Sequence, residues 1–348
     1  MLEKEYFMKK THKIRALARV AVAIALVGSA FSGCLVDKER FSIVVPDGAP
    51  ALALAKLMSE DEENDGVSYT VVDASTIAAR VTNRDMEKNA DFCVLPVTAA
   101  SKLLGNGEKY RMLGLVTQGN LYLVSKKFSA EVDVSNPIGL YGKTLGALKM
   151  NEVPGLTLMA TLGRLGIAYT ALGGGETARE DALNLQAVDA KGVDGSLDYY
   201  LVAEPQASKL KKAGFALVGD LQALYARSSG EYGYPQAVLV VKTEILDENA
   251  GFVKSFVEKV ANAGEWLYSA DAEQIFAAVT AHFDDELRSP SFSVETLKRE
   301  TLERCGIRFS YAWECKERVN EFLSEMIAVN ERAAAIPLDG FYQREWKE

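Results

Sequence analysis

The sequence predicts an α/β protein with two lobes, each a mainly parallel sheet flanked by helices. Short apolar, strand-like runs alternate with helix-like segments, which is the rhythm of βαβ units. The rhythm starts near residue 41 and again near residue 143, and the apolar run 236–241 leads the chain back to the first lobe. We therefore expect residues 41–122 and 235–348 to form lobe 1, residues 123–234 to form lobe 2, and a ligand cleft to lie between them.

The elements of lobe 1 follow from runs of β-branched and other apolar residues that end at turn residues such as Pro46 and Pro96. The predicted strands are 41–45, 67–72, 90–95, 110–116 and 121–124. The predicted helices between them are 51–58, 75–88 (with Ser75 as its N-cap) and 98–104.

The same signals continue through the rest of the chain. In lobe 2 they predict strands at 143–148, 167–171 and 197–203, and helices at 156–165, 178–190 and 206–212. After the returning strand, apolar residues recur at three- and four-residue spacing. This spacing predicts helices at 249–267, 271–283, 293–304 and 312–329.

Composition excludes several functional classes. The 348 residues are 48% apolar and 25% charged, with a formal net charge of −9, so the chain is globular and has the wrong charge for a general nucleic-acid binder. There are only two histidines, and His12 lies in the basic N-terminal stretch, which leaves His282 as the sole imidazole of the folded part. Catalytic triads and histidine-rich zinc sites are therefore not expected, and we predict no enzyme activity, no metal and no cofactor.

The N-terminus has the order of a secretory signal peptide. Residues 1–33 contain six basic and two acidic side chains, then the apolar run 20–27, then small residues up to Cys34. An uncleaved anchor helix with an incidental cysteine is the alternative, and Met8 is an alternative translation start. In either case we expect the protein outside the cytoplasm, and residues 34–348 carry a formal net charge of −13.

The three remaining cysteines show no metal-ligand spacing. Cys93 lies in an apolar run and is expected to be a buried free thiol. Cys305 and Cys315 are ten residues apart, and the sequence leaves open whether they form a disulfide or stay reduced.

Loops at the carboxyl ends of the predicted strands should line the cleft, because helix N-termini point to the same edge. These loops are 46–51, 96–99, 118–120, 151–157, 204–206 and 234–236. The candidate ligand-binding residues are Asp47, Gly48, Ala49, Pro50, Pro96, Val97, Thr98, Gln118, Asn120, Asn151, Pro154, Gly155, Thr157, Glu204, Gln206, Tyr234 and Gln236. The turn sequences around Asp47 and Pro154, and Glu204 before Pro205, also have a purely structural interpretation.

The loops indicate a class of solute. None contains Lys or Arg, whereas Asp47, Glu152 and Glu204 bring negative charge, so no bidentate clamp for an anion is expected. Amide side chains suit the edges of a heterocycle, and tyrosines such as Tyr234 could stack on a ring. We predict a small neutral or weakly cationic solute. The alternative is an anion of the sulfonate or nitrate type held by helix N-termini.

Five segments together resemble a known family. FSGC at 31–34 resembles a bacterial lipobox, with Phe31 where Leu is usual. VPDGAPALALAKL (45–57), ADFCVLPVTAA (90–100), LVAEPQ (201–206) and YPQAVLVVK (234–242) resemble the solute-binding lipoproteins of bacterial ABC importers, of the type for nitrate, sulfonates and thiamine-precursor pyrimidines. The resemblance implies a two-lobed type II periplasmic-binding fold.

The resemblance also implies a role and partners. Residues 1–33 would be the signal peptide and 34–40 a tether, with Cys34 lipidated at the cell membrane. The expected partners are the solute, an ABC permease and its ATPase, with no nucleic acid and the protein a monomer. A cleft enzyme on the same fold and a surface adhesin that has lost transport are the alternatives; the leader argues against the enzyme, because the related pathways run in the cytoplasm.

Overall fold

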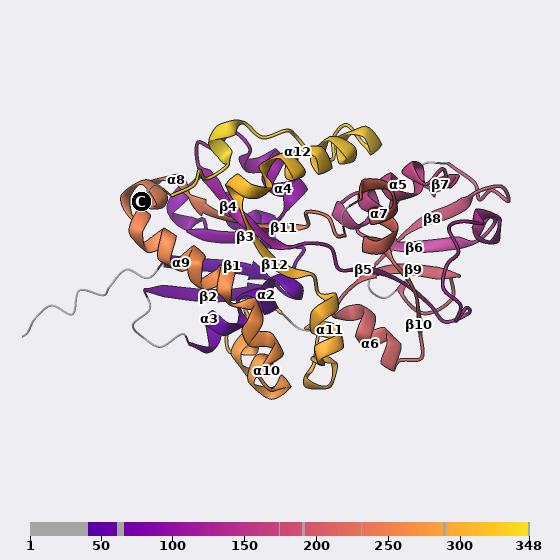
Figure 1. The fold of residues 1–348 in the computed structure, drawn as a ribbon, viewed down its shortest axis with the longest axis horizontal. Coiled ribbons are helices and arrows are strands. Elements are labelled where there is room, and N and C mark those ends of the chain that lie inside the picture. Colours follow the sequence, from indigo (N-terminus) through magenta and orange to yellow (C-terminus); the bar gives the residue numbers. More distant parts are fainter. Residues whose placement is uncertain are drawn as a thin grey trace, which may run out of the picture. The chain divides into compact units, whose positions relative to one another are not determined.

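Two six-stranded sheets organise the part of the chain that the structure describes (Figure 1). This computed structural model describes residues 41–60, 66–173, 175–189, 192–230, 232–287 and 290–346. The predicted signal peptide, the tether and Cys34 lie outside the described residues.

The first sheet has the strand order β12-β4-β11-β3-β1-β2. Its strands are β1 (Phe41–Pro46), β2 (Val67–Val72), β3 (Phe92–Pro96), β4 (Tyr110–Thr117), β11 (Ala237–Lys242) and β12 (Ile307–Tyr311). β1 pairs in parallel with β2 and β3, whereas β11 runs antiparallel to both β3 and β4. The sheet is mixed because β11, which returns from the second sheet, and β12, which is antiparallel to β4, both run opposite to the other four strands.

Helices cover both faces of this sheet, and the alternation of side chains along the strands decides which residues each helix meets. Ile43 and Val45 belong to one apolar core with α2 (Ala49–Ala53), α3 (Ala55–Ser59), α9 (Ala250–Asn262) and α10 (Ala272–Thr280). Val44 and Leu95 face the opposite way, into a core with α4 (Val97–Leu104) and α12 (Ala312–Val329). Short helices α8 (Thr243–Glu248) and α11 (Arg299–Arg304) complete this half.

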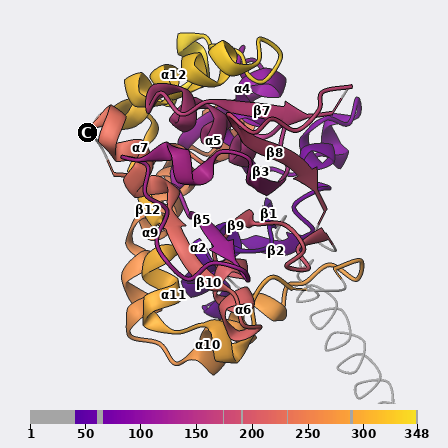
Figure 2. The same ribbon diagram turned by 90° about the vertical axis from the view of Figure 1, so that its right-hand side faces the viewer.

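The second sheet has the strand order β10-β5-β9-β6-β8-β7. Its strands are β5 (Leu121–Ser125), β6 (Thr144–Leu148), β7 (Tyr169–Leu172), β8 (Leu183–Val188), β9 (Tyr199–Ala203) and β10 (Ala216–Asp220). α6 (Gln206–Lys212) covers one face, and α5 (Val153–Arg164) and α7 (Leu221–Ser229) cover the other. Helix α12 of the first half packs on α5, and both ribbon views place the two helices side by side (Figures 1 and 2).

The main chain crosses between the sheets beside Gly119. Gly119 and Gly306 both have positive φ angles, of 76° and 63°. A Cβ atom on Gly306 would lie 2.0 Å from the carbonyl oxygen of Gly119, so the two backbones are in direct contact. The N–H of Gln118 donates to the carbonyl of Gly306 at 2.8 Å and fixes this contact. The predicted lobe boundaries lie near the two places where the chain changes sheets: 122/123 follows Gly119, and 234/235 precedes β11. The boundaries themselves stay a prediction.

Several predicted elements are wrong, for physical reasons. Helix 75–88 is instead two short 3-10 helices, Ile77–Val81 and Met86–Lys88, and Asp73 rather than Ser75 organises the turn by accepting two hydrogen bonds from Ser75. The predicted helix 178–190 contains strand β8 (Leu183–Val188), because pairing with β6 and β7 outweighs the helix propensity of its Ala, Leu and Gln residues.

Among the strands and α-helices of the described residues, four have no counterpart in the sequence-based expectations: β10, α7, α8 and β12. Most of the remaining elements lie within a few residues of their predicted positions, and α6 and α12 have the predicted bounds.

The structure shows the state of the three described cysteines and whether any described helix could cross a membrane. Cys93 is a buried free thiol, as predicted, and Cys305 and Cys315 are also free and buried. Among the helices within the described residues, none combines the length and apolar character needed to cross a membrane.

Candidate functional site

A pocket of about 240 Å³ lies between the two sheets. The loop after β1 and the ends of β3 and β4 line it from the first sheet; the loop after β6 and the end of β9 line it from the second. Most of its wall is apolar, with side chains such as Ile77, Leu121 and Val153. Such a small, largely apolar cavity with a few polar groups is typical of a small-molecule site.

Ten predicted ligand-binding residues line this pocket, so the carboxyl ends of the strands do meet there. They are Asp47, Gly48, Ala49, Pro50, Pro96, Asn120, Pro154, Glu204, Gln206 and Gln236.

The other seven predicted residues are not part of the pocket lining, and several make bonds within the fold. The side chain of Gln118 lies between Arg308 and Ser310, and the hydroxyl of Tyr234 donates to Gln222 at 2.9 Å. Thr157 bonds to the carbonyl of Val153 one helical turn earlier. Val97 and Thr98 are buried in α4, Asn151 is exposed in a turn, and Gly155 packs against the backbone of Met150.

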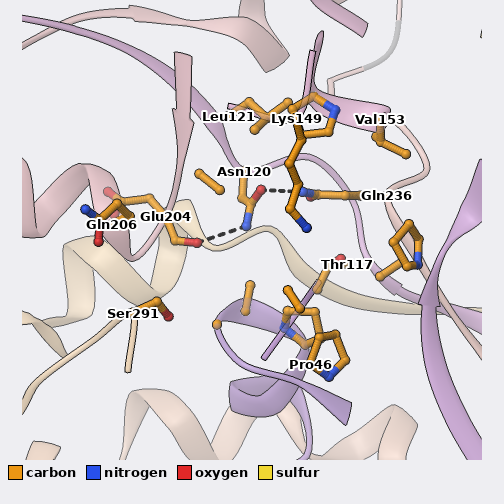
Figure 3. Close-up of a pocket in the computed structure, with 18 of the residues that line it drawn as sticks. Pro46, Thr117, Asn120, Leu121, Lys149, Val153, Glu204, Gln206, Gln236 and Ser291 are labelled. Atoms are coloured by element: carbon orange, nitrogen blue, oxygen red, sulfur yellow. Dashed lines mark hydrogen bonds between the residues drawn. The ribbon is translucent and has the colours of Figure 1, made fainter. Parts of the chain in front are cut away.

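The pocket also contains polar residues that sequence reasoning missed. Lys149 lines it from the turn between β6 and α5, where its φ angle is +52°, and its ammonium group lies 3.6 Å from a carboxylate oxygen of Glu152 (Figure 3). A longer loop window after β6 would have included Lys149. Thr117 is the last residue of β4, one position before a predicted loop. Ser291 follows no strand, so no sequence signal pointed to it.

Glu204 is buried and its charge is balanced inside the protein. Its carboxylate accepts hydrogen bonds from the backbone and hydroxyl of Ser208, both at 2.9 Å, and from Nε of Arg304 at 2.7 Å. The expectation that negative charge reaches the cleft without positive charge is therefore wrong on two counts. Arg304 neutralises Glu204, and Lys149 brings a cation to the wall.

Asn120 and Gln236 form a fixed amide pair in the pocket wall (Figure 3). The carbonyl of Glu204 can only accept, so the Nδ2 group of Asn120 points at it at 3.0 Å. The Oδ1 atom of Asn120 must then face Gln236, whose Nε2 group donates to it at 2.6 Å. The Oε1 atom of Gln236 is consequently left as an acceptor, and it has no partner among the described residues.

Asp47 is the polar group of the pocket whose environment is most unusual. One carboxylate oxygen accepts the backbone N–H of Ser291 at 2.7 Å; the other is buried without a well-formed hydrogen bond among the described residues, although the hydroxyl of Ser291 and the N–H of Gly48 lie near the carboxylate. Burial raises the pKa of Asp47 above its ordinary value of 3.8; hydrogen bonding from Ser291 opposes this shift and the negative charge of Asp73 adds to it. Burial therefore disfavours the ionised form of Asp47 in the ligand-free protein.

We expect Asp47→Asn to raise the melting temperature of the ligand-free protein at neutral pH by roughly 2 °C, for a gain of about 1 kcal/mol. A raised folded-state pKa means that the folded protein binds the extra proton more tightly than the unfolded chain. The ionised carboxylate therefore lowers stability above that pKa, and the penalty disappears as the pH falls to 3.8. Melting curves of both proteins between pH 3.5 and 7.5 measure this. A difference that does not shrink toward acid pH would contradict it.

Comparisons with known proteins identify the fold. No family model matches the chain, and no curated protein is similar to it in sequence. Solved structures do match: an ABC transporter protein from Parabacteroides distasonis has a TM-score of 0.64 at 19% identity, covering 88% of this chain and 100% of the other.

Two more matches agree with the first. The periplasmic aliphatic sulphonate binding protein of Escherichia coli has a TM-score of 0.61 at 12% identity and covers 89% of this chain and 95% of its own. The ligand-binding component of an ABC-type import system of Staphylococcus aureus, with zinc bound, has a TM-score of 0.56 at 14% identity and covers 88% and 96%. The fold is that of the periplasmic binding proteins. The predicted fold class is therefore confirmed.

Proposed function

We propose that this protein is the solute-binding component of an ABC importer, held at the outer side of the cell membrane through lipidated Cys34. The observation that carries the proposal is the pocket between the two sheets, where apolar walls surround a few polar atoms that make no well-formed hydrogen bond with the described residues. The similar fold of import proteins supports it. The solute would be small and neutral or weakly cationic, as a thiamine-precursor-like heterocycle is, and the loaded protein would deliver it to a permease and its ATPase.

The buried cysteines support a binding protein rather than an enzyme that uses a thiolate nucleophile. Burial raises the pKa of Cys93 and Cys305, and it raises the pKa of Cys315 to about 12, so none of these three groups supplies a thiolate nucleophile. None of the three lines the pocket.

The proposal predicts that a small solute raises the melting temperature of the purified protein. A ligand at one hundred times its Kd adds about 2.7 kcal/mol to the stability. A thermal-shift screen of several hundred bacterial metabolites, with each hit repeated by calorimetry, is the test. If no compound in the screen stabilises the protein, the proposal is contradicted. If the protein turns over a hit, a cleft enzyme is favoured instead.

Attachment to the membrane has its own test. Full-length protein expressed in a bacterium should fractionate with membranes and gain the mass of a lipid, and Cys34→Ser should abolish both. Unchanged fractionation of Cys34→Ser would favour the uncleaved anchor helix.

An anion-binding alternative has one observation in its favour. Lys149 and the N-terminal residues Val153 and Pro154 of α5 lie on the same wall of the pocket, which suits a sulfonate or carboxylate. Stabilisation by an alkanesulfonate and not by amines would support this alternative.

A further inference from the structure

Four buried polar side-chain atoms of residues that line the pocket make no well-formed hydrogen bond in the described part of the chain. They are Oδ1 of Asp47, Oγ1 of Thr117, Oε1 of Gln236 and Oγ of Ser291. The one other such atom among the described residues, Nε1 of Trp346, is not in the pocket. A buried polar atom without a partner destabilises the folded protein, because it has lost its hydrogen bonds to water. Their concentration in one cavity indicates that a bound molecule, or water in its absence, completes these bonds.

The chemistry of these atoms defines what they can bind. An ionised Asp47 can only accept, and its other oxygen is already held by the N–H of Ser291. The unpartnered Oε1 atom of Gln236 can only accept as well, whereas its Nε2 group donates one of its two N–H groups to Asn120. The hydroxyls of Thr117 and Ser291 can donate or accept. A matching ligand therefore brings at least two hydrogen-bond donors to this wall.

The charges around the pocket favour a positively charged donor. Lys149 faces Glu152 at 3.6 Å, and Arg304 faces Glu204 at 2.7 Å, so each cation has a carboxylate of its own. Asp47 has no cationic partner among the ion pairs of the described residues, and Asp73, which itself feels the positive charge of Lys149, adds a second negative charge close to it. The local balance is negative on the side where the acceptors lie.

An inorganic cation fits poorly. The described residues contain no group of three or more His, Cys, Asp or Glu side chains that could hold a metal ion. The rest of the wall is apolar, with Pro46, Ile77, Pro96 and Leu201 among its members. A ligand that fills about 240 Å³ must therefore carry an apolar body next to its polar end.

From these observations we infer that the pocket binds a small organic cation with at least two N–H donors, such as an amidinium or a protonated amino-heterocycle. The donors bond to Asp47, Gln236 and the hydroxyls of Ser291 and Thr117, and the apolar body lies against the proline and leucine side chains. The inference rests on the proposed function, because it names the solute class of the same pocket.

A matched set of probes tests the inference. Benzamidine has a cationic N–H end, benzamide is neutral, phenyltrimethylammonium is a cation without N–H groups, and benzoate and benzenesulfonate are anions, all on the same ring. We expect benzamidine to bind about tenfold more tightly than benzamide by calorimetry, with phenyltrimethylammonium and both anions weaker still. Equal binding of benzamidine and benzamide, or preference for an anion, would overturn the inference.

Variants test whether the acceptor atoms of the pocket, and not a general loss of structure, account for changes in binding. Asp47→Asn and Ser291→Ala should each weaken benzamidine binding about tenfold or more. The control is Asp133→Asn, since Asp133 likewise accepts hydrogen bonds from a nearby serine but is not in the pocket. It should leave binding unchanged. Unchanged binding by Asp47→Asn would contradict the assignment.

A second measurement distinguishes failure of the inference from failure of the proposed function. The purified protein is incubated with a bacterial small-molecule extract, washed and unfolded, and the released compounds are identified by mass spectrometry. Release of an organic cation supports both proposals. Release of an anion overturns the inference and leaves the proposed function standing. If nothing is released and no probe binds, both are contradicted.

Discussion

Replacing Arg304 by methionine should destabilise the protein by about 3–5 kcal/mol, because the carboxylate of Glu204 would stay behind as a buried charge without a partner. The side chain of Glu204 is fully buried and that of Arg304 is 18% exposed. The pair joins the end of α11 in the first half of the fold to the turn after β9 in the second. Ser208 and Thr301, whose hydroxyls lie 2.9 Å apart, extend the same contact.

The measurement is the urea midpoint of Arg304→Met, compared with that of the double variant Arg304→Met/Glu204→Met. The double variant should recover most of the loss, because removing both charges leaves no charge uncompensated. Arg179→Met is the control, since Arg179 pairs with Asp181 at the exposed surface, and its midpoint should stay unchanged. Equal losses in the single and double variants would mean that Arg304 stabilises by packing over Tyr122 rather than by charge.

The fold was predictable because its signals are local. Apolar runs such as 67–72 and helical spacing such as 312–329 lie in short stretches of sequence, and the structure has β2 and α12 at those bounds. The strand ends in turn indicated ten of the residues that line the pocket, since the loops after β1, β3 and β9 meet there as parallel sheets require. Asp47, Pro96 and Glu204 followed from this rule alone.

Contacts between side chains that lie far apart in the sequence were not predictable from the sequence. The neutralisation of Glu204 depends on Arg304, one hundred residues later, and no local pattern announces that partner. Ser291 reaches the pocket from a segment that follows α10, so it obeys no strand-end rule. Loop charges alone therefore cannot define the solute class, because a count of acidic and basic residues does not show which of them are already paired within the protein.

Strand β8 shows where the prediction of secondary structure from local sequence fails. Its residues, Leu183–Val188, include good helix formers, and alternation is weak because only its first three residues are buried. The backbone pairs with β6 on one side and β7 on the other, which fixes it as a strand. Tertiary pairing of this kind outweighs a propensity difference of a few tenths of a kcal/mol per residue.

Gly306→Ala should have an effect of at least about 4 kcal/mol, because the new Cβ atom would meet backbone that cannot move aside. It would lie 2.0 Å from the carbonyl oxygen of Gly119 and 3.1 Å from that of Gln118, within the crossing between the two sheets. Relief of this clash would break the hydrogen bond from Gln118 to Gly306, and with it the support of the segment that carries Thr117 and Asn120 to the pocket.

The matched control is Gly166→Ala. Gly166 has nearly the same φ angle, 69° against 63°, but nothing lies within 4 Å of its added Cβ. Its loss should be limited to the left-handed backbone penalty of about 1–2 kcal/mol. Urea unfolding measures both variants. A milder variant, Gly119→Ala, keeps the comparison informative if Gly306→Ala does not fold, because the atoms nearest its Cβ belong to the side chains of Gln222 and Tyr234 rather than to backbone. If Gly306→Ala and Gly166→Ala lost the same stability, the contact between the two crossing backbones would not hold the halves of the fold together. The free energy of unfolding that Gly306→Ala loses beyond the loss in Gly166→Ala therefore measures how much the contact between the two backbones stabilises the fold.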